Sequence, residues 1–172
     1  MYQLVTQAVG FVATGLEIGS YQCKSSRKLI FVQMCGNVAF LIHMLMLGAY
    51  SGCINLLISC IRNHVLSSKG AWARWKGWLW ILICANLLGT LFTWENLFSI
   101  LPCIAVVSVT ASCWTRNGKK IRIASFCCSS PSWLIYDIYT GSYSGIIAEI
   151  FVLCSVGISV LRHGWKALDV AE

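Results

Sequence analysis

Two five-residue stretches, Gly48-Ala49-Tyr50-Ser51-Gly52 and Gly141-Ser142-Tyr143-Ser144-Gly145, share the pattern G-x-Y-S-G and decide the fold of this chain. They begin 93 residues apart, at positions 48 and 141, and each lies between two strongly apolar runs. Glycine permits a tight backbone turn, and a tyrosine ring suits the level of a membrane–water interface. The pattern therefore predicts two structural corners on one face of a membrane, each joining a pair of helices.

The composition of the chain points to the bilayer as its solvent. Of the 172 residues, 58% are hydrophobic and 11% are charged, and the mean hydropathy is +0.72. Soluble domains carry about 25% charged residues, so a soluble fold would have too little polar surface. A helix crosses the hydrocarbon core of a bilayer in about 20 residues, and seven such helices fill nearly the whole chain. The sequence predicts an all-α polytopic membrane protein with seven transmembrane helices.

The predicted spans are long apolar runs separated by short polar connections. They cover residues 3–21, 28–47, 50–66, 77–93, 97–114, 121–140 and 144–161. The segment 67–76 between the third and fourth spans is basic and carries Trp72 and Trp75. Tryptophan beside basic residues is typical of a membrane–water interface, and the flanking apolar spans favour this interpretation over a nucleic-acid patch.

The positions of the basic residues predict the topology. With seven spans, every Lys and Arg falls on one side of the membrane, and the opposite side carries none. Cytoplasmic loops hold the excess of Lys and Arg, so the N-terminus is predicted outside and the C-terminus inside. The same map explains the net charge of +7 without nucleic acid. The basic residues are Lys24, Arg27, Lys28, Arg62, Lys69, Arg74, Lys76, Arg116, Lys119, Lys120, Arg122, Arg162 and Lys166.

The chain also contains an internal repeat. Residues 31–55 placed on 124–148 without a gap give eight identities in 25 positions, four of them in the two G-x-Y-S-G stretches. We therefore predict a first three-helix repeat over 1–66, a linker with the fourth helix over 67–96, a second repeat over 97–162 and a cytoplasmic tail over 163–172. Parallel repeats related by an axis along the membrane normal are a transporter design, with substrate sites near the midplane.

The layout of three helices, one linker helix and three helices is similar to that of the SWEET sugar transporters and the PnuC-type vitamin transporters. At the level of residues, the chain resembles the YgjV-type family of bacterial inner-membrane proteins, which implies that location and no particular substrate. The residues that carry this resemblance are Gln22-Cys23-Lys24-Ser25-Ser26-Arg27-Lys28, residues 37–52, Asn55, Arg62-Asn63, and residues 133–137 through Glu149.

The resemblance to SWEET proteins also singles out one position. Those proteins place an Asn of each repeat in the substrate pocket, which implies a pocket role for Asn55. At the register-matched position of the second repeat the chain departs from this pattern, because it has Ala148 there and Glu149 one place on. SWEET-like prolines are present only in the second unit, as Pro102 and Pro131.

Ionisable and polar residues within the predicted spans are the candidates for function, because such groups are costly in a membrane. His43 and Tyr136 share one repeat position, and Asp137 follows Tyr136, so a His–acid pair there could relay protons or bind a polar ligand. For Glu17 the competing interpretation is an ion pair with the adjacent basic loop. The predicted solute-binding residues are Asn37, His43, Asn55, Trp133, Tyr136, Asp137 and Glu149.

Each candidate also has a purely structural interpretation. Asn37 and Asn55 would serve as interhelical hydrogen-bond partners worth about 1 kcal/mol each, Trp133 as a packing or lipid contact, and Asp137 as part of an exposed helix end. Pro102 and Pro131 are the predicted hinges, because proline removes a helical hydrogen bond and kinks a span. Asn37, Asn55, Trp133 and Glu149 place the predicted site deeper than the two turns.

The sequence gives no sign of an enzyme or of a bound cofactor. It contains no phosphate-binding loop, nucleophile elbow or metal motif, and none of its ten cysteines forms a C-x-x-C pair. We therefore expect a transporter of a small polar solute embedded in the lipid bilayer. The alternative is a non-transporting membrane scaffold or regulatory subunit. Gly10, Gly15 and Gly19 in the first helix would leave room for contacts between subunits of a homo-oligomer.

Overall fold

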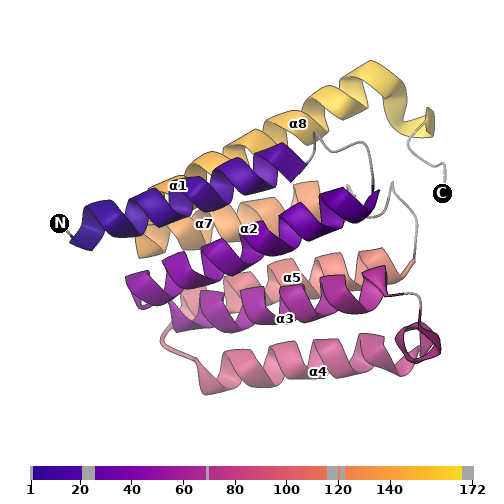
Figure 1. The fold of residues 1–172 in the computed structure, drawn as a ribbon, viewed down its shortest axis with the longest axis horizontal. Coiled ribbons are helices and arrows are strands. Elements are labelled where there is room, and N and C mark those ends of the chain that lie inside the picture. Colours follow the sequence, from indigo (N-terminus) through magenta and orange to yellow (C-terminus); the bar gives the residue numbers. More distant parts are fainter. Residues whose placement is uncertain (1, 21–25, 69, 116–119, 121–122, 168–172) are drawn as a thin grey trace.

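The computed structural model describes all of the chain except residues 1, 21–25, 69, 116–119, 121–122 and 168–172 (Figure 1). The described part contains helices and no strands, which confirms the all-α prediction for that part. The α-helices are α1 (Tyr2–Ser20), α2 (Ser26–Leu47), α3 (Tyr50–Ser67), α4 (Gly77–Phe92), α5 (Ile100–Trp114), α7 (Ser130–Thr140) and α8 (Tyr143–Ala167). The described chain also contains two 3₁₀ helices, η1 (Ala71–Arg74) and η2 (Leu97–Ser99), and a π-helical segment, η3 (Ser125–Ser129).

The predicted helices and the observed ones agree closely at most boundaries. The largest difference is at the C-terminal end, where α8 continues to Ala167 although the predicted span ends at 161. The helix therefore runs into the segment predicted as a polar tail over 163–172. Between α5 and α7 the predicted span over 121–140 is divided by the π-helical segment η3.

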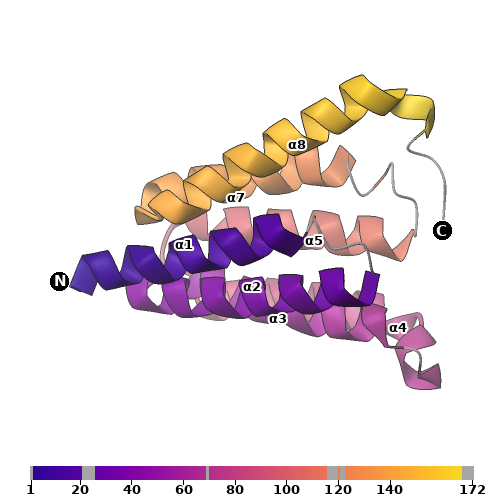
Figure 2. The same ribbon diagram turned by 45° about the horizontal axis from the view of Figure 1, so that its top comes forward.

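The helices form a ring with one helix outside it. Contacts run from α1 to α2, α2 to α3, α3 to α5, α5 to α7, α7 to α8 and back from α8 to α1, while α4 packs on α3 and α5 (Figures 1 and 2). The first three helices of the chain thus meet the last three along two seams, α1 against α8 and α3 against α5. The helix predicted as a linker, α4, lies against one of these seams.

Successive helices alternate in direction through the bundle. The two glycine turns and the connection between α4 and α5 lie at the end of the bundle where the chain starts (Figure 1). The C-terminal ends of α1, α3, α5 and α8 lie at the opposite end. This alternation is what a multi-pass chain requires, whereas the direction of the bundle relative to the two sides of the membrane stays a prediction.

The glycines that open the two turns have the backbone conformation that favours glycine. The φ angle is 74° at Gly48 and 71° at Gly141, and these are the positive-φ glycines of the described chain. A residue with a Cβ is strained in this left-handed region. Each glycine therefore ends its helix, α2 or α7, and turns the chain into the next one.

The hydrogen bonds of the two turns match one another. The Ala49 N–H donates to the Met44 carbonyl at 3.0 Å, and the Ser142 N–H donates to the Asp137 carbonyl at 2.9 Å. In both turns the glycine N–H also donates to the carbonyl three residues back. This pair of bonds is the Schellman motif that closes helix C-terminal ends, so the two turns are built in the same way.

Apolar side chains cover much of the outer surface of the bundle. Phe92, Leu97 and Leu4 are 89%, 80% and 77% exposed, whereas many polar side chains are buried. The buried polar residues include Thr6, His43, Asn55, Asn86, Asp137, Ser142 and Ser144. Apolar residues outside and hydrogen-bonding residues inside are the arrangement expected of helices packed in lipid.

One segment of the described chain, Leu97–Trp114, is long and apolar enough by itself to cross a membrane. Shorter apolar helical segments cover Met34–Leu47, Gly77–Phe92 and Tyr143–Cys154. The predicted number of seven spans is thus not settled by helix length and composition.

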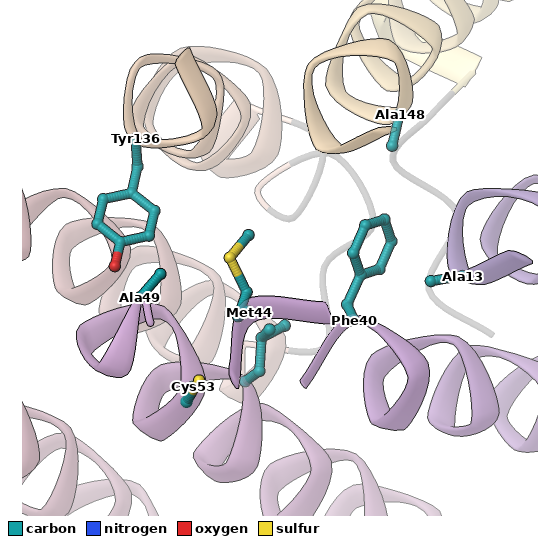
Figure 3. Packing of buried hydrophobic residues seen from close by; sticks show 8 residues of the cluster. Ala13, Phe40, Met44, Ala49, Cys53, Tyr136 and Ala148 are labelled. Carbon is teal, nitrogen blue, oxygen red and sulfur yellow. The ribbon is translucent and has the colours of Figure 1, made fainter. Parts of the chain in front are cut away.

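A cluster of buried apolar side chains joins the two halves of the chain near the glycine turns. Figure 3 shows its members converging from α1, α2, α3, α7 and α8. Met44 and Tyr136 are each 2% exposed, and Ala49 of the first turn packs in the same cluster. A second, smaller cluster of Ile58, Leu82 and Val106 fills the space between α3, α4 and α5. These clusters hold the side chains of the candidate site in place.

Candidate functional site

His43 is fully buried and makes a hydrogen bond through each ring nitrogen. Its Nδ1 lies 2.8 Å from the Thr6 carbonyl oxygen of α1. Its Nε2 lies 2.9 Å from Ser142 Oγ and 3.3 Å from Ser144 Oγ, both in the second glycine turn. Because a carbonyl oxygen only accepts, Nδ1 carries a proton and donates it. A side chain of the first half of the chain is therefore fixed by the turn of the second half.

Ser142 joins His43 to the predicted acidic partner. Its hydroxyl accepts a hydrogen bond from the Gly145 N–H at 3.2 Å and is also a hydrogen-bond partner of the Asp137 carboxyl. Asp137 is 3% exposed, so it is not the exposed helix end of the structural interpretation. The structure brings His43 and Asp137 together through a serine, which the sequence did not predict.

Two glycines make room for this group of polar side chains. A Cβ at Gly10 of α1 would overlap Ser144 Oγ and would lie 2.8 Å from His43 Cε1. A Cβ at Gly145 would overlap the carboxyl group of Asp137. The expectation that Gly10 serves contacts between subunits is therefore wrong, because its open side is filled within the chain. Gly15 has no atom within 4 Å of an added Cβ.

Tyr136, at the repeat position of His43, reaches the first glycine turn. Its hydroxyl oxygen accepts a hydrogen bond from the Gly52 N–H at 3.0 Å. Trp133 packs edge-on against the Tyr136 ring, with the ring centroids 6.0 Å apart. Trp133 also contacts both apolar clusters. His43 and Tyr136, which share one repeat position, thus each contact the glycine turn of the opposite half of the chain.

Three carboxyl groups come within electrostatic reach of one another: Asp137 is buried, whereas Glu17 and Glu149 are partly exposed. The charges of Glu149 in α8 and Glu17 in α1 interact electrostatically with the Asp137 carboxyl, and Glu17 interacts in the same way with Glu149. The Ser130 side chain is a hydrogen-bond partner of the Glu149 carboxyl. Asp137 Oδ1 is buried without a hydrogen-bond partner among the described residues. Nowhere in the described chain do three or more His, Cys, Asp or Glu side chains form a group that could hold a metal ion.

The backbone of α1 at Glu17 packs closely on α2, and the Glu17 residue is partly exposed. Its backbone nitrogen is 3.5 Å from the place where a Cβ of Gly36 would stand, in the middle of α2. The competing interpretation, an ion pair with the basic loop, concerns Lys24, Arg27 and Lys28, whose side chains lie outside the described part of the chain. Asn37, next to Gly36, is partly exposed.

Pro131 stands directly after a change in the helix. The segment Ser125–Ser129 is π-helical, and the Ser130 N–H donates to the Ser125 carbonyl, five residues back. Proline has no N–H and cannot make the usual bond to the carbonyl four residues back. Short π-helical segments are frequent at functional sites, and this one ends directly before Ser130, the partner of Glu149.

Pro102 lies in the first turn of α5, where a missing N–H removes no helical hydrogen bond, and its role as a hinge stays a prediction.

Asn55 lies apart from the group around His43. Its Nδ2 donates to the Ser51 carbonyl at 2.7 Å and to Thr90 Oγ1 of α4 at 3.4 Å, and its Oδ1 has no partner in the described chain. Asn86, one turn before Thr90, is 1% exposed, and neither of its side-chain polar atoms has a partner in the described chain. The structure therefore places Asn55 in a separate polar contact between α3 and α4.

Several residues of the site escaped the sequence analysis. Ser142, Ser144 and Gly10 belong to it, although the two serines were expected to be parts of a structural corner. One difference between the two repeats could have pointed to this site: the second turn has a serine, Ser142, at the position where the first turn has Ala49. Side-chain type alone did not show that this serine faces into the bundle.

A bundle of helices with apolar side chains outside and hydrogen-bonded polar groups inside is typical of a membrane protein. The model of the family described as "Bacterial inner membrane protein" (Imp-YgjV) matches residues 4–166, so the chain belongs to this family. It is a bacterial inner-membrane protein, and its helical structure is consistent with several passes. No curated protein and no solved structure matches the chain, so the likeness to SWEET and PnuC-type transporters stays a prediction.

Proposed function

We propose that this protein carries a small polar solute across the inner membrane by alternating access between two helix triplets, α1–α3 and α5–α8. The observation that carries the proposal is a set of polar groups in a bundle whose outside is apolar: Asp137 and Ser130 are buried, and the partly exposed Glu149 is a hydrogen-bond partner of Ser130. Buried ionisable groups are costly in a membrane, and they mark substrate or ion pathways. A protein with only a structural task would have little reason to keep them.

The seams between the triplets support the same proposal. The triplets meet at α1 against α8 and at α3 against α5, and the polar group with Glu17 and Glu149 lies by the first of these seams. Rigid-body rocking of one repeat against the other around a fixed site is the usual way in which such folds alternate access. Pro131 and the π-helical segment before it would allow the second triplet to bend beside Glu149.

The chemistry of the site bears on the solute. Carboxyl groups and serine hydroxyls can bind a solute that has hydroxyl groups, amide groups or a positive charge. The proposal assigns no catalytic reaction to this group.

The two equivalent turns fit a duplicated unit, and we propose that the chain arose from one three-helix unit.

Transport by proteoliposomes tests the proposal. The full chain is reconstituted, and uptake of radiolabelled sugars, nucleosides, vitamins and small amines is measured against empty liposomes. We expect uptake of at least one class, reduced ~10-fold or more by Glu149→Gln, which corresponds to about 1.4 kcal/mol. Glu95→Gln is the matched control, because Glu95 is exposed in the connection after α4. Equal uptake by Glu149→Gln and the unchanged chain would contradict the assigned site.

The alternative function, a membrane scaffold or regulatory subunit, makes the opposite prediction. In that case the whole panel gives no uptake, a partner co-purifies in fixed ratio, and Glu149→Gln and Asn55→Ala leave that complex unchanged. This set of results would replace the transporter by the scaffold.

A further inference from the structure

The hydroxyl of Ser142 has three partners and one proton. Its oxygen accepts from the Gly145 N–H at 3.2 Å and lies 2.9 Å from His43 Nε2. The Asp137 carboxyl lies against Gly145, where an added Cβ would overlap it, and this places it within reach of the Ser142 hydroxyl. A serine hydroxyl donates one hydrogen bond and accepts two. Gly145 takes one acceptor position, so the remaining donor and acceptor must be divided between His43 and Asp137.

When Ser142 bridges the two groups, it can do so in two ways that differ only in where the protons are. Ser144 Oγ, 3.3 Å from His43 Nε2, is a second hydroxyl that can donate to a neutral His43. His43 Nδ1 always donates, because it faces the Thr6 carbonyl oxygen. If His43 is neutral, Ser142 donates to its Nε2 and accepts from a protonated Asp137. If His43 is a cation, its Nε2 donates to Ser142, and Ser142 donates to an ionised Asp137. Each arrangement gives the Ser142 hydroxyl and both ring nitrogens of His43 a hydrogen-bond partner.

We propose that His43, Ser142 and Asp137 form a proton-binding site in which one proton is shared between the carboxyl and the imidazole through the serine hydroxyl. In the transfer, the O–H bond of Asp137 breaks as its proton joins Ser142 Oγ, while the original hydroxyl proton leaves Ser142 and forms an N–H bond at His43 Nε2. The reverse transfer restores the first state. Atoms and charge balance, and no other reactant takes part.

The groups that surround the row come from α1, α7 and α8. Glu149 and Glu17 face Asp137 from α8 and α1, and Tyr136 is its neighbour on α7. His43 is enclosed by the Thr6 carbonyl, by Gly10 and by Ser144 Oγ at 3.3 Å. Carbonyl and hydroxyl oxygens are the polar atoms around the imidazole, and they can stabilise its charge.

The location of the row gives the proton a structural effect. His43 belongs to the first triplet, whereas Ser142 and Asp137 belong to the second. Hydrogen bonds with one ionised partner are roughly twice as strong as neutral ones. Transfer of the proton to His43 would therefore tighten the contact between the triplets at the end of the bundle that holds the glycine turns. A cationic group bound at Glu149 would weaken the negative field on Asp137 and so favour that transfer.

The use of this site in transport rests on the proposed function, but the shared proton itself does not. Infrared difference spectroscopy of the full chain in lipid, recorded between acid and alkaline pH without any solute, tests the proton directly. The Asp137 carboxyl band is identified by its loss in Asp137→Asn, and the His43 imidazolium band by its loss in His43→Gln. We expect the two bands to change together, in one common pH step.

Ser142→Ala removes the hydroxyl and should split this common step into two separate steps, or abolish one of them. Ser144→Ala is the matched control, because Ser144 contacts His43 from the same turn but is not part of the row to Asp137. It should leave the common step intact. Asp137→Asn gives a second measurement in a variant of nearly unchanged size, and it should shift the His43 step.

Three results would overturn the proposal: separate steps in the unchanged chain, no pH step from either group, or a common step that survives Ser142→Ala. Size-exclusion profiles establish that each variant is folded before its spectrum is compared. Because no solute is present, this experiment can fail while transport is observed, and it can succeed in a protein that transports nothing in the panel.

Discussion

In the first glycine turn, Ala49 is buried among Met44 and Tyr136 in an apolar cluster, whereas in the second turn Ser142 stands between His43 and Asp137. The backbones of the two turns are nearly the same, with φ angles of 74° and 71° at their opening glycines. What differs is the set of side chains at equivalent positions. The two turns therefore show one backbone device used once for apolar packing and once for a polar site.

The comparison extends to the glycines that end the two turns. A Cβ at Gly52 would lie 2.9 Å from Tyr136 Cε1 and 3.4 Å from Met44 Sδ, and a Cβ at Gly145 would overlap the Asp137 carboxyl. Asp137 takes the place that Met44 has in the first half of the chain, 93 positions earlier. The space is made in the same way in both halves, and the residue that fills it decides whether the corner is apolar or polar.

The largest expected effect comes from closing the space beside the polar turn. Gly10→Ala should lower the free energy of unfolding by about 2–3 kcal/mol, the upper part of the range for overpacked cores, because its Cβ meets His43 and Ser144. Unfolding in mixed micelles with increasing SDS, followed by tryptophan fluorescence, measures this change. Gly15→Ala on the same helix is the control and should cause no loss. Equal stability of the two variants would mean that α1 does not pack against the second turn.

The next effect tests whether the two turns have equivalent backbones. Gly48→Ala and Gly141→Ala should each lower the free energy of unfolding by about 1–2 kcal/mol, the cost of the left-handed conformation for a residue with a Cβ. Nothing lies within 4 Å of the added Cβ in either turn, so conformational strain is the only expected cause. The same SDS titration applies. A loss in one variant and none in the other would break the equivalence.

The smallest effect concerns the hydroxyl of the apolar corner. Tyr136→Phe should lower the free energy of unfolding by about 1 kcal/mol, because the buried Gly52 N–H loses its hydrogen-bond acceptor. Tyr139→Phe is the matched control on the same helix. Its hydroxyl accepts from exposed Asn96 Nδ2 at 2.7 Å, where water can replace it. A larger loss in the control than in Tyr136→Phe would contradict the importance assigned to the cross-bundle bond.

The sequence was a good guide to the helices and a partial guide to the candidate site. Apolar runs of membrane length, bounded by glycine and basic connections, were sufficient to place most helix ends. His43, Tyr136 and Asp137 were predicted to share a level in the bundle, and the structure connects His43 to Asp137. Asn55 was grouped with them, but the structure places it against Thr90 of α4. Distance along the helices was readable in the sequence, but the direction in which each side chain points around the bundle was not.

The sequence by itself determined an all-helical membrane protein with two matching glycine turns, because composition, hydropathy and glycine positions act locally along the chain. The bacterial inner membrane came from the family to which the chain belongs. Only the tertiary structure decided that the second turn belongs to the polar site. Ser142 reaches His43 across 99 residues of sequence, because α1 packs against both α2 and α8. Such a contact depends on how helices pack and rotate against one another, and no local pattern in an apolar chain fixes that rotation.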